Sequence, residues 1–338
     1  MSHLLLGAAG ESFINHYFDE FWVVLILKVA FVMIVVLTAP LAVGYMEHKV
    51  LAHMQSRLGP MEAGVFHGWA QLIADGVKFI QKENVVPAAA DRTIYSLAPA
   101  VAMVPYIAIL VVLPFSDTLF ALNLDIGIFF VMAMASVGVI GVLMAGWSSA
   151  NKFSLIGALR AAAQLIAYEL PLVLAAAGVV MLSGVTSMVG IVEAQESLWY
   201  VIPLFPLFVI FMLASLAELS RTPFDMPVAD SEIIFGAYTE YGGLKFAFFL
   251  LAEYGGIVAL SGVAAVLFLG GYQGLPGIPL PDPIWMAGKI GILSFFVIWL
   301  RATYPRLRED QLQRFAWLTL IPISLVWILG AAVFKVAF

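Results

Sequence analysis

The sequence contains no cysteine and few charged residues. Without cysteine it forms no disulfide, no thiolate metal site and no iron–sulfur centre of its own. Charged residues make up 11% of the 338 residues, whereas they average about 25% in soluble domains. Hydrophobic residues make up 63%, against about 45–50% in soluble domains. The mean hydropathy is +1.01. This composition excludes a water-soluble globular protein and indicates a membrane protein.

Histidine is also scarce, and the usual cofactor motifs are missing. None of the five histidines lies in the middle of an apolar run (His3, His16, His48, His53 and His67), so a haem held by two histidines within the bilayer has no ligands. The sequence contains no glycine-rich nucleotide motif, no P-loop and no HExxH motif. The net charge of −6 argues against a nucleic-acid partner. Electrons for any redox reaction must therefore come from a partner.

Long apolar runs predict an all-α integral membrane protein. A helix needs about 20 apolar residues to cross a bilayer, and eight runs qualify, at 22–46, 94–115, 126–147, 155–182, 199–217, 244–270, 284–301 and 314–337. We therefore expect residues 1–338 to form one polytopic domain, a bundle of about eight transmembrane helices. The opening MSHLLLGAAGESF lacks a basic leader region, so we expect no cleavable signal.

Lysine and arginine are unequally distributed between the two sides of this bundle. Twelve lie on one side (Lys49, Arg57, Lys78, Lys82, Arg92, Lys152, Arg221, Lys245, Arg301, Arg306, Arg308 and Arg314), and the loops 116–125, 183–198 and 271–283 contain none. Because cytoplasmic loops carry the excess of basic residues, segments 47–93, 218–243 and 302–313 are predicted to be cytoplasmic and both termini to lie outside. No internal repeat is evident, which disfavours an inverted-repeat transporter.

The first cytoplasmic segment contains a stretch with helical periodicity. Apolar residues recur every three or four positions from Val65 to Ile80, and polar residues such as Asp75 and Lys78 occupy the other face. This pattern predicts an amphipathic helix that lies on the membrane or beneath another subunit. A surface helix without a specific partner is the alternative.

The fourth apolar run contains Arg160, Gln164, Tyr168 and Glu169. The first three are four residues apart and share one helix face, whereas Glu169 falls on the opposite face and about 13.5 Å further along the axis than Arg160. Ionisable groups this deep in a membrane are costly and usually functional. A neutral Glu169 that hydrogen-bonds a neighbouring helix is the structural alternative.

The segment 217–254 combines carboxylates with prolines and aromatic residues. Six carboxylates occur here (Glu218, Asp225, Asp230, Glu232, Glu240 and Glu253), with Arg221 and Lys245 as the basic residues. So many like charges near a low-dielectric phase should raise several pKa values, and coupled groups of this kind suit proton transfer. A solvated acidic loop is the alternative interpretation.

Several strings resemble a known family. They are MEHKVLAHMQSRLGPMEAG from Met46, RAAAQLIAYELPL from Arg160, AELSRTPFDMPVADSE with AYTEYGGLKFAFFLLAEY from Ala217 onward, and RATYPRLREDQL from Arg301. Together they resemble the family of the H subunit of respiratory complex I, the proton-translocating NADH:quinone oxidoreductase. This family includes mitochondrial NADH dehydrogenase subunit 1. The resemblance is collinear and extends over nearly the whole chain.

The resemblance implies a quinone chamber at the membrane surface and a line of carboxylates that leads toward antiporter-like subunits. By position, the chamber residues are Glu47, Arg57, Arg221, Asp225, Asp230, Glu232, Glu240 and Arg301, and the proton path contains Arg160, Glu169, Glu218 and Glu253. The implied substrate is a quinone, ubiquinone or menaquinone. NADH, FMN and iron–sulfur clusters are expected on partner subunits, and the isolated chain is expected to be inactive. The implied location is the bacterial plasma (inner) membrane.

The sequence departs from the family pattern at several positions. His48 and Met61 replace a usual Arg and Asn, Val228 replaces the Glu that follows the PFD-x-P string, and Glu309 replaces a common Tyr. These departures leave other functions open: the homologous anchor of a hydrogenase or another dehydrogenase, a stand-alone proton or cation transporter, or a purely structural anchor.

Overall fold

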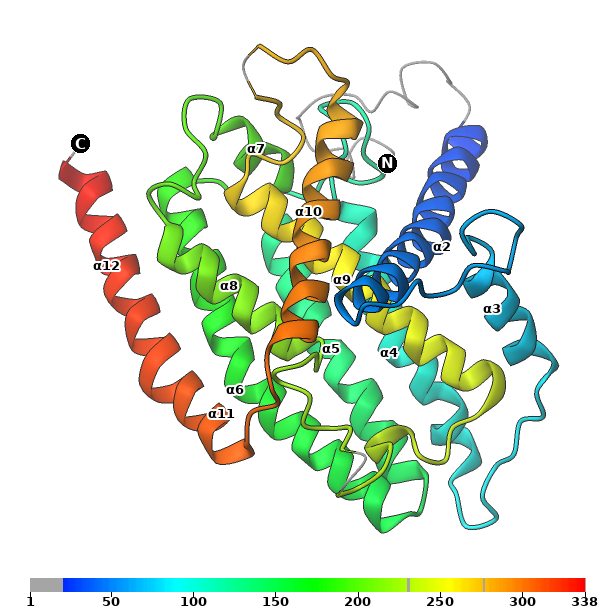
Figure 1. Ribbon diagram of the computed structural model, residues 1–338. Helices are drawn as coiled ribbons and strands as arrows, with labels where there is room; N and C mark the ends of the chain where they lie inside the picture. Colours follow the sequence, from blue (N-terminus) through cyan, green and yellow to red (C-terminus); the bar gives the residue numbers. More distant parts are fainter. Residues whose placement is uncertain (1–20, 230–231, 276, 338) are drawn as a thin grey trace.

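The computed structural model describes residues 21–229, 232–275 and 277–337, and within these ranges the chain forms helices and no strand (Figure 1). The long helices are α2 (Phe21–Met54), α4 (Arg92–Val112), α5 (Gly127–Ser148), α6 (Lys152–Ser183), α9 (Gly243–Phe268) and α10 (Asp282–Thr303). A last continuous helix consists of α11 (Glu309–Phe315), the π-helical η2 (Ala316–Leu320) and α12 (Ile321–Ala337). The short elements are α3 (Gln71–Gln81), α7 (Met188–Glu193), α8 (Phe205–Glu218) and the 3-10 turn η1 (Gly236–Tyr238).

Seven helices in the described ranges are long and apolar enough to cross a membrane, and they correspond to seven of the eight predicted spans. The predicted span 199–217 is wrong in length, because α8 has only 14 residues and is about 21 Å long. Its start is set by Pro203 and Pro206, which lack a backbone N–H and are tolerated only before or within the first helical turn.

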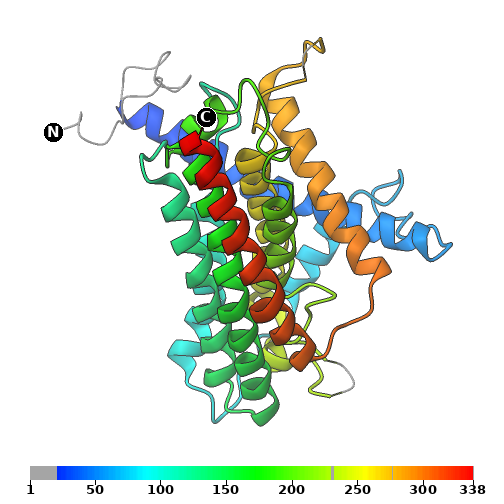
Figure 2. The same cartoon turned by 90° about the vertical axis from the view of Figure 1, so that its left-hand side faces the viewer.

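Helix α9 is the centre of the bundle. Of its apolar window 78% is buried, against 11% for α2. It packs against α4, α10 and α2, while α2 runs at a steep angle to the layer of α4, α5 and α6 (Figures 1 and 2). Glu253 on α9 therefore lies among several helices. Glu47 lies near the C-terminal end of α2, where that helix reaches the bundle.

Two lysines cap helix ends at the end of the bundle that contains α7. Where α9 ends, Lys289 donates hydrogen bonds of 2.6–2.7 Å to the backbone oxygens of Leu269, Gly271 and Gln273. Where α6 ends, Lys335 donates hydrogen bonds of 2.9 Å to the backbone oxygens of Met181 and Leu182. Helix C-terminal carbonyls lack partners and carry partial negative charge. Both ammonium groups are thus used within the chain, at an end whose loops contain no other basic residue.

The amphipathic helix is shorter than its periodicity predicts. Helix α3 begins at Gln71, and residues 65–70 form turns in which Val65 and His67 have positive φ angles of 67° and 54°. Ile73, Val77 and Ile80 form an exposed apolar face on α3. Its placement at a membrane surface or beneath another subunit stays a prediction.

Candidate functional site

The site is built around Arg221, three residues beyond the end of α8. Its side chain is 2% exposed, and it pairs with two carboxylates from different helices: Glu47 of α2 at 2.5 Å and Glu253 of α9 at 2.6 Å. Glu47, itself buried, also accepts a hydrogen bond from Arg301 at the end of α10. The guanidinium lies over the ring of Tyr254, 4.9 Å from its centroid. These pairs join α2, α8, α9 and α10 at one point.

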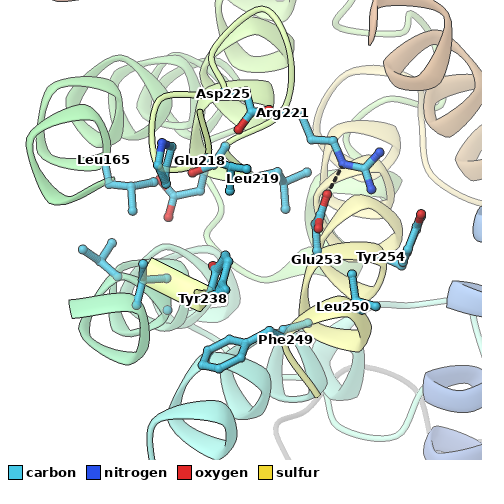
Figure 3. A pocket seen from close by; sticks show the side chains of 18 of the residues that line it. Leu165, Glu218, Leu219, Arg221, Asp225, Tyr238, Phe249, Leu250, Glu253 and Tyr254 are labelled. Atoms are coloured by element: carbon cyan, nitrogen blue, oxygen red, sulfur yellow. Dashed lines mark ion pairs between the residues drawn. The ribbon is translucent and has the colours of Figure 1, made fainter. Parts of the chain in front are cut away.

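A cavity of about 360 Å³ opens beside this ion-pair cluster. Its polar lining comes from α4, α8, α9, α10, η1 and the segment after α8, and includes Tyr106, Glu218, Arg221, Asp225, Tyr238, Glu253, Tyr254 and Arg301. Leu165, Leu219, Phe249 and Leu250 supply apolar walls (Figure 3). Val228, where the family pattern has a Glu, also lines the cavity. A pocket of this size with a few converging polar groups is typical of a ligand site.

Two carboxyl groups in the cavity are suited to holding a proton. Glu218 is buried, and its Oε2 has no hydrogen-bond partner among the described residues; an unpaired carboxylate there would be costly, which favours the neutral acid. Burial raises the pKa of Asp225 to about 6, with a further increase from Glu253 and a decrease from Arg306 and Arg301. Asp225 therefore changes its protonation state near neutral pH.

The segment after α8 is held by a buried amide. The Nε2 of Gln164 on α6 donates to the backbone oxygens of Ala217 at 2.7 Å and Phe224 at 2.6 Å. Further along, Ala229 pairs with Ile234, and Ile234 has a φ of 57°, which is rare for a β-branched residue. Strained backbone of this kind clusters at functional sites.

Glu169 lies away from the cavity lining. Ser136 of α5 donates a hydrogen bond to its Oε1, and the carboxyl is close enough to Glu218 to interact with it electrostatically. Glu169 forms no ion pair with Arg160, which agrees with the prediction from their nine-residue spacing.

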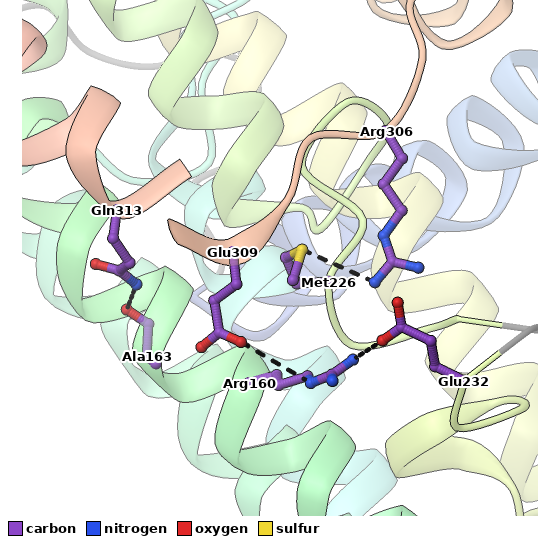
Figure 4. A network of polar contacts seen from close by, with 7 residues as sticks. All are labelled: Arg160, Ala163, Met226, Glu232, Arg306, Glu309 and Gln313. Atoms are coloured by element: carbon purple, nitrogen blue, oxygen red, sulfur yellow. Dashed lines mark hydrogen bonds and ion pairs between the residues drawn. The ribbon is translucent and has the colours of Figure 1, made fainter. Parts of the chain in front are cut away.

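Arg160 forms a separate network at the end of the bundle. It pairs with Glu232 at 2.6 Å and with Glu309 of α11 at 4.0 Å (Figure 4), and the side chains of Glu232 and Glu309 are 52% and 47% exposed. The hydrogen bond from Arg160 lowers the pKa of Glu232, so this carboxyl does not share the increase seen at Asp225. Glu309, one of the departures from the family pattern, thus contacts a residue of the predicted proton path.

Two other predicted chamber residues, Arg57 and Glu240, do not line the cavity, and a third lies outside the described residues. Arg57 is exposed after α2 and donates to Gln55 at 2.8 Å. Glu240 accepts a hydrogen bond of 2.6 Å from Asn151 at the start of α6, which fixes the turn after η1 to the bundle. Asp230 lies outside the described residues.

Sequence reasoning missed Tyr106 and Tyr238 as cavity residues. Tyr106 stands in an apolar context with no charged neighbour, Tyr238 stands two residues before Glu240 in the acidic segment 217–254, and no signal in the sequence indicates which way either ring points. Among the described residues, no group of three or more His, Asp or Glu side chains could hold a metal ion.

Comparison with known proteins gives consistent matches along the chain. The family model described as NADH dehydrogenase matches residues 27–332. A protein of Dehalococcoides mccartyi, named as the H subunit of NADH-quinone oxidoreductase, is 46% identical over 309 residues, covering 91% of this chain and 86% of the relative. Proteins of the same name from Geobacillus kaustophilus and Frankia casuarinae are 43% and 41% identical, covering 86% and 99% of this chain and 88% and 78% of theirs.

Proposed function

The chain belongs to the NADH dehydrogenase family, and from this premise we propose that it is a membrane subunit of a proton-translocating NADH:quinone oxidoreductase. Its relatives are named as the H subunit of NADH-quinone oxidoreductase, and its apolar helices make it a multi-pass membrane protein. The observation that carries the proposal within the structure is the cavity lined by Arg221 and Glu253, which pair with each other, while Arg221 also pairs with Glu47 beside the cavity.

The quinone chamber is the cavity and the segment that closes it. Reduction of a quinone to a quinol takes two electrons and two protons, and the electrons come from partner subunits that hold NADH, FMN and iron–sulfur clusters. Asp225, with its pKa of about 6, supplies protons at this end. Arg221 orients Glu47 and Glu253, Arg301 orients Glu47, and both arginines provide donors toward a quinone oxygen.

The proton path leads from the cavity into the bundle through carboxyl groups. Glu253 and Glu218 both line the cavity, and Glu169 interacts with Glu218 from α6. Withdrawal of protons from Asp225 changes the charge beside Glu253, and the change in charge shifts the protonation of the next carboxyl along this line. We assign Arg160, which the resemblance implies as a member of this path, instead to the network that it forms with Glu232 and Glu309 at the end of the bundle.

The remaining predicted residues take positions around this chamber. Arg57 and Asp230 belong to segments 47–93 and 218–243, which we assign with 302–313 to the cytoplasmic surface where electron-carrying partners dock. Glu240 fixes the turn that carries Tyr238 into the cavity. The relatives are bacterial, and the basic residues lie on one side, so we assign the chain to the bacterial plasma membrane with both termini outside.

Purification of the tagged chain in mild detergent tests the proposal. We expect iron–sulfur, NADH-binding and antiporter-like subunits to co-purify, as identified by mass spectrometry, and the preparation to reduce a quinone with NADH. If a nickel–iron subunit or another dehydrogenase co-purified in their place, the chain would belong to a complex with a different electron donor. Recovery of the chain alone, active in liposomes, would make it a stand-alone transporter.

Replacing Glu169 with Gln tests the proton path. The amide keeps the hydrogen bond from Ser136 but cannot ionise, so we expect normal assembly and a decrease in proton-coupled quinone reduction of about tenfold or more. Glu193→Gln, on α7 at the other end of the bundle, is the matched control and should leave the rate unchanged. Wild-type coupled activity in Glu169→Gln would remove Glu169 from the path.

A further inference from the structure

Tyr106 occupies a slot in the cavity wall that two glycines create. A Cβ atom on Gly256 of α9 would lie 2.9 Å from Cε1 and 3.1 Å from Cζ of the ring, closer than carbon atoms pack. A Cβ atom on Gly138 of α5 would touch the end of the ring, 3.5 Å from the hydroxyl oxygen. The ring of Tyr106 thus stands between α5 and α9, and a side chain at position 256 would collide with it and with Leu219, whose Cδ2 would lie 2.4 Å from the added Cβ.

The hydroxyl of Tyr106 makes no hydrogen bond to any described residue, although buried phenols usually find a partner. It lies on the cavity, where it interacts electrostatically with Glu218 from α8, Tyr238 from η1 and Glu253 from α9. Two of these three groups are carboxyls of the proposed proton path. A cavity of about 360 Å³ has room for several water molecules between them.

We infer that Tyr106 is a proton-relay residue that connects Glu253 with Glu218 through cavity water. A phenol is both a donor and an acceptor, and with an ordinary pKa of about 10 it is neutral at working pH. One carboxylic acid gives its proton to the phenolic oxygen as that oxygen passes its own proton toward the other carboxylate. The phenol ends neutral, so no co-reactant is needed. This inference rests on the proposed function, because it adds a member to the same path.

A relay role differs from two other roles for a tyrosine at this position. If the ring only filled the slot, phenylalanine would replace it without any effect. If the hydroxyl bound the quinone, its loss would raise the quinone KM. A relay predicts an unchanged KM together with a loss of proton transfer.

The test is Tyr106→Phe in the complete complex, reconstituted in proteoliposomes and driven by NADH with a short-chain quinone. We expect normal assembly, a quinone KM within about twofold of wild type, and a decrease in protons translocated per NADH of about twofold or more. The solvent deuterium isotope effect on turnover should increase, because the slower proton transfer then limits the rate.

Tyr200→Phe is the matched control, since Tyr200 is a buried tyrosine outside the cavity whose hydroxyl donates to Ala194 at 3.3 Å. It should keep the wild-type stoichiometry. Wild-type stoichiometry and isotope effect in Tyr106→Phe, or an increase in KM with stoichiometry unchanged, would overturn the relay. A wild-type complex that translocates no protons would instead contradict the proposed function itself.

Discussion

Arg221→Met is expected to abolish quinone reductase activity and to prevent most of the chain from assembling into its complex. The change leaves Glu47, whose side chain is 3% exposed, without one of its two cations, and it leaves Glu253 without its only ion-pair partner among the described residues. Removing one partner from a fully buried ion pair costs about 3–5 kcal/mol, and we expect the lower end of that range here because Arg301 still pairs with Glu47 and the Glu253 side chain is 35% exposed. Native gel electrophoresis of membranes and NADH:quinone activity per assembled complex measure the two effects.

Two further variants separate charge from geometry at this position. Arg221→Lys keeps the charge but cannot reach two carboxylates with a planar fork, so we expect partial assembly and low activity. Arg308→Met removes an exposed arginine whose one ion pair among the described residues is with Asp310 nearby, and it should behave as wild type. Full activity of Arg221→Met would contradict the role of the cluster as the centre of the site.

Gly236→Ala should disrupt the segment that closes the cavity. Gly236 has a φ of 51°, and a Cβ atom there would lie 1.7 Å from the backbone oxygen of Pro227, so the backbone itself must move. Residues Pro227 and Phe235 both line the cavity, and their displacement changes its walls. We expect assembled complex with quinone reductase activity lowered by about tenfold or more, since left-handed strain alone costs about 1–3 kcal/mol.

The control for this variant lies six residues away. A Cβ atom on Gly242 would have no neighbouring atom within 4 Å, and its φ of −137° is extended, so Gly242→Ala should keep wild-type activity. Limited proteolysis of membranes should cut Gly236→Ala faster than Gly242→Ala within 218–243. Equal activity and equal cleavage in both variants would show that the segment tolerates the added methyl group.

Hydropathy and charge were enough to predict most of the fold. Seven predicted spans correspond to long apolar helices, because a bilayer requires long apolar runs whatever their packing. The ends of the helices were harder to predict. Prolines shorten α8, and the predicted first turns of α3 are replaced by turns with left-handed backbone at Val65 and His67. These are local backbone effects that an apolar periodicity does not encode.

The charged residues of the candidate site could be predicted from the sequence, whereas the residues that form the cavity walls could not. Arg221, Glu218 and Glu253 stand out as ionisable groups in apolar sequence, and the structure brings them to one cavity. Glu240 carries the same signal but bonds to Asn151 instead, because the path of the turn after η1 decides where its side chain points. Tyr106 carries no signal, since its position depends on how α4 rotates against α5 and α9.

The contact between Tyr106 and Gly256 also constrains how this sequence can drift over evolution. A Cβ atom at position 256 would lie 2.4 Å from Cδ2 of Leu219 and 2.9 Å from Cε1 of Tyr106, so a gain of atoms at position 256 has to accompany a loss of atoms at both positions 106 and 219. A lineage that shortens both residues is then free to fill position 256, and once it has done so neither large side chain can return alone. Across relatives the size of residue 256 should therefore vary in the opposite direction to the sizes of residues 106 and 219, and relatives with a small residue at 106 need another route for the proton.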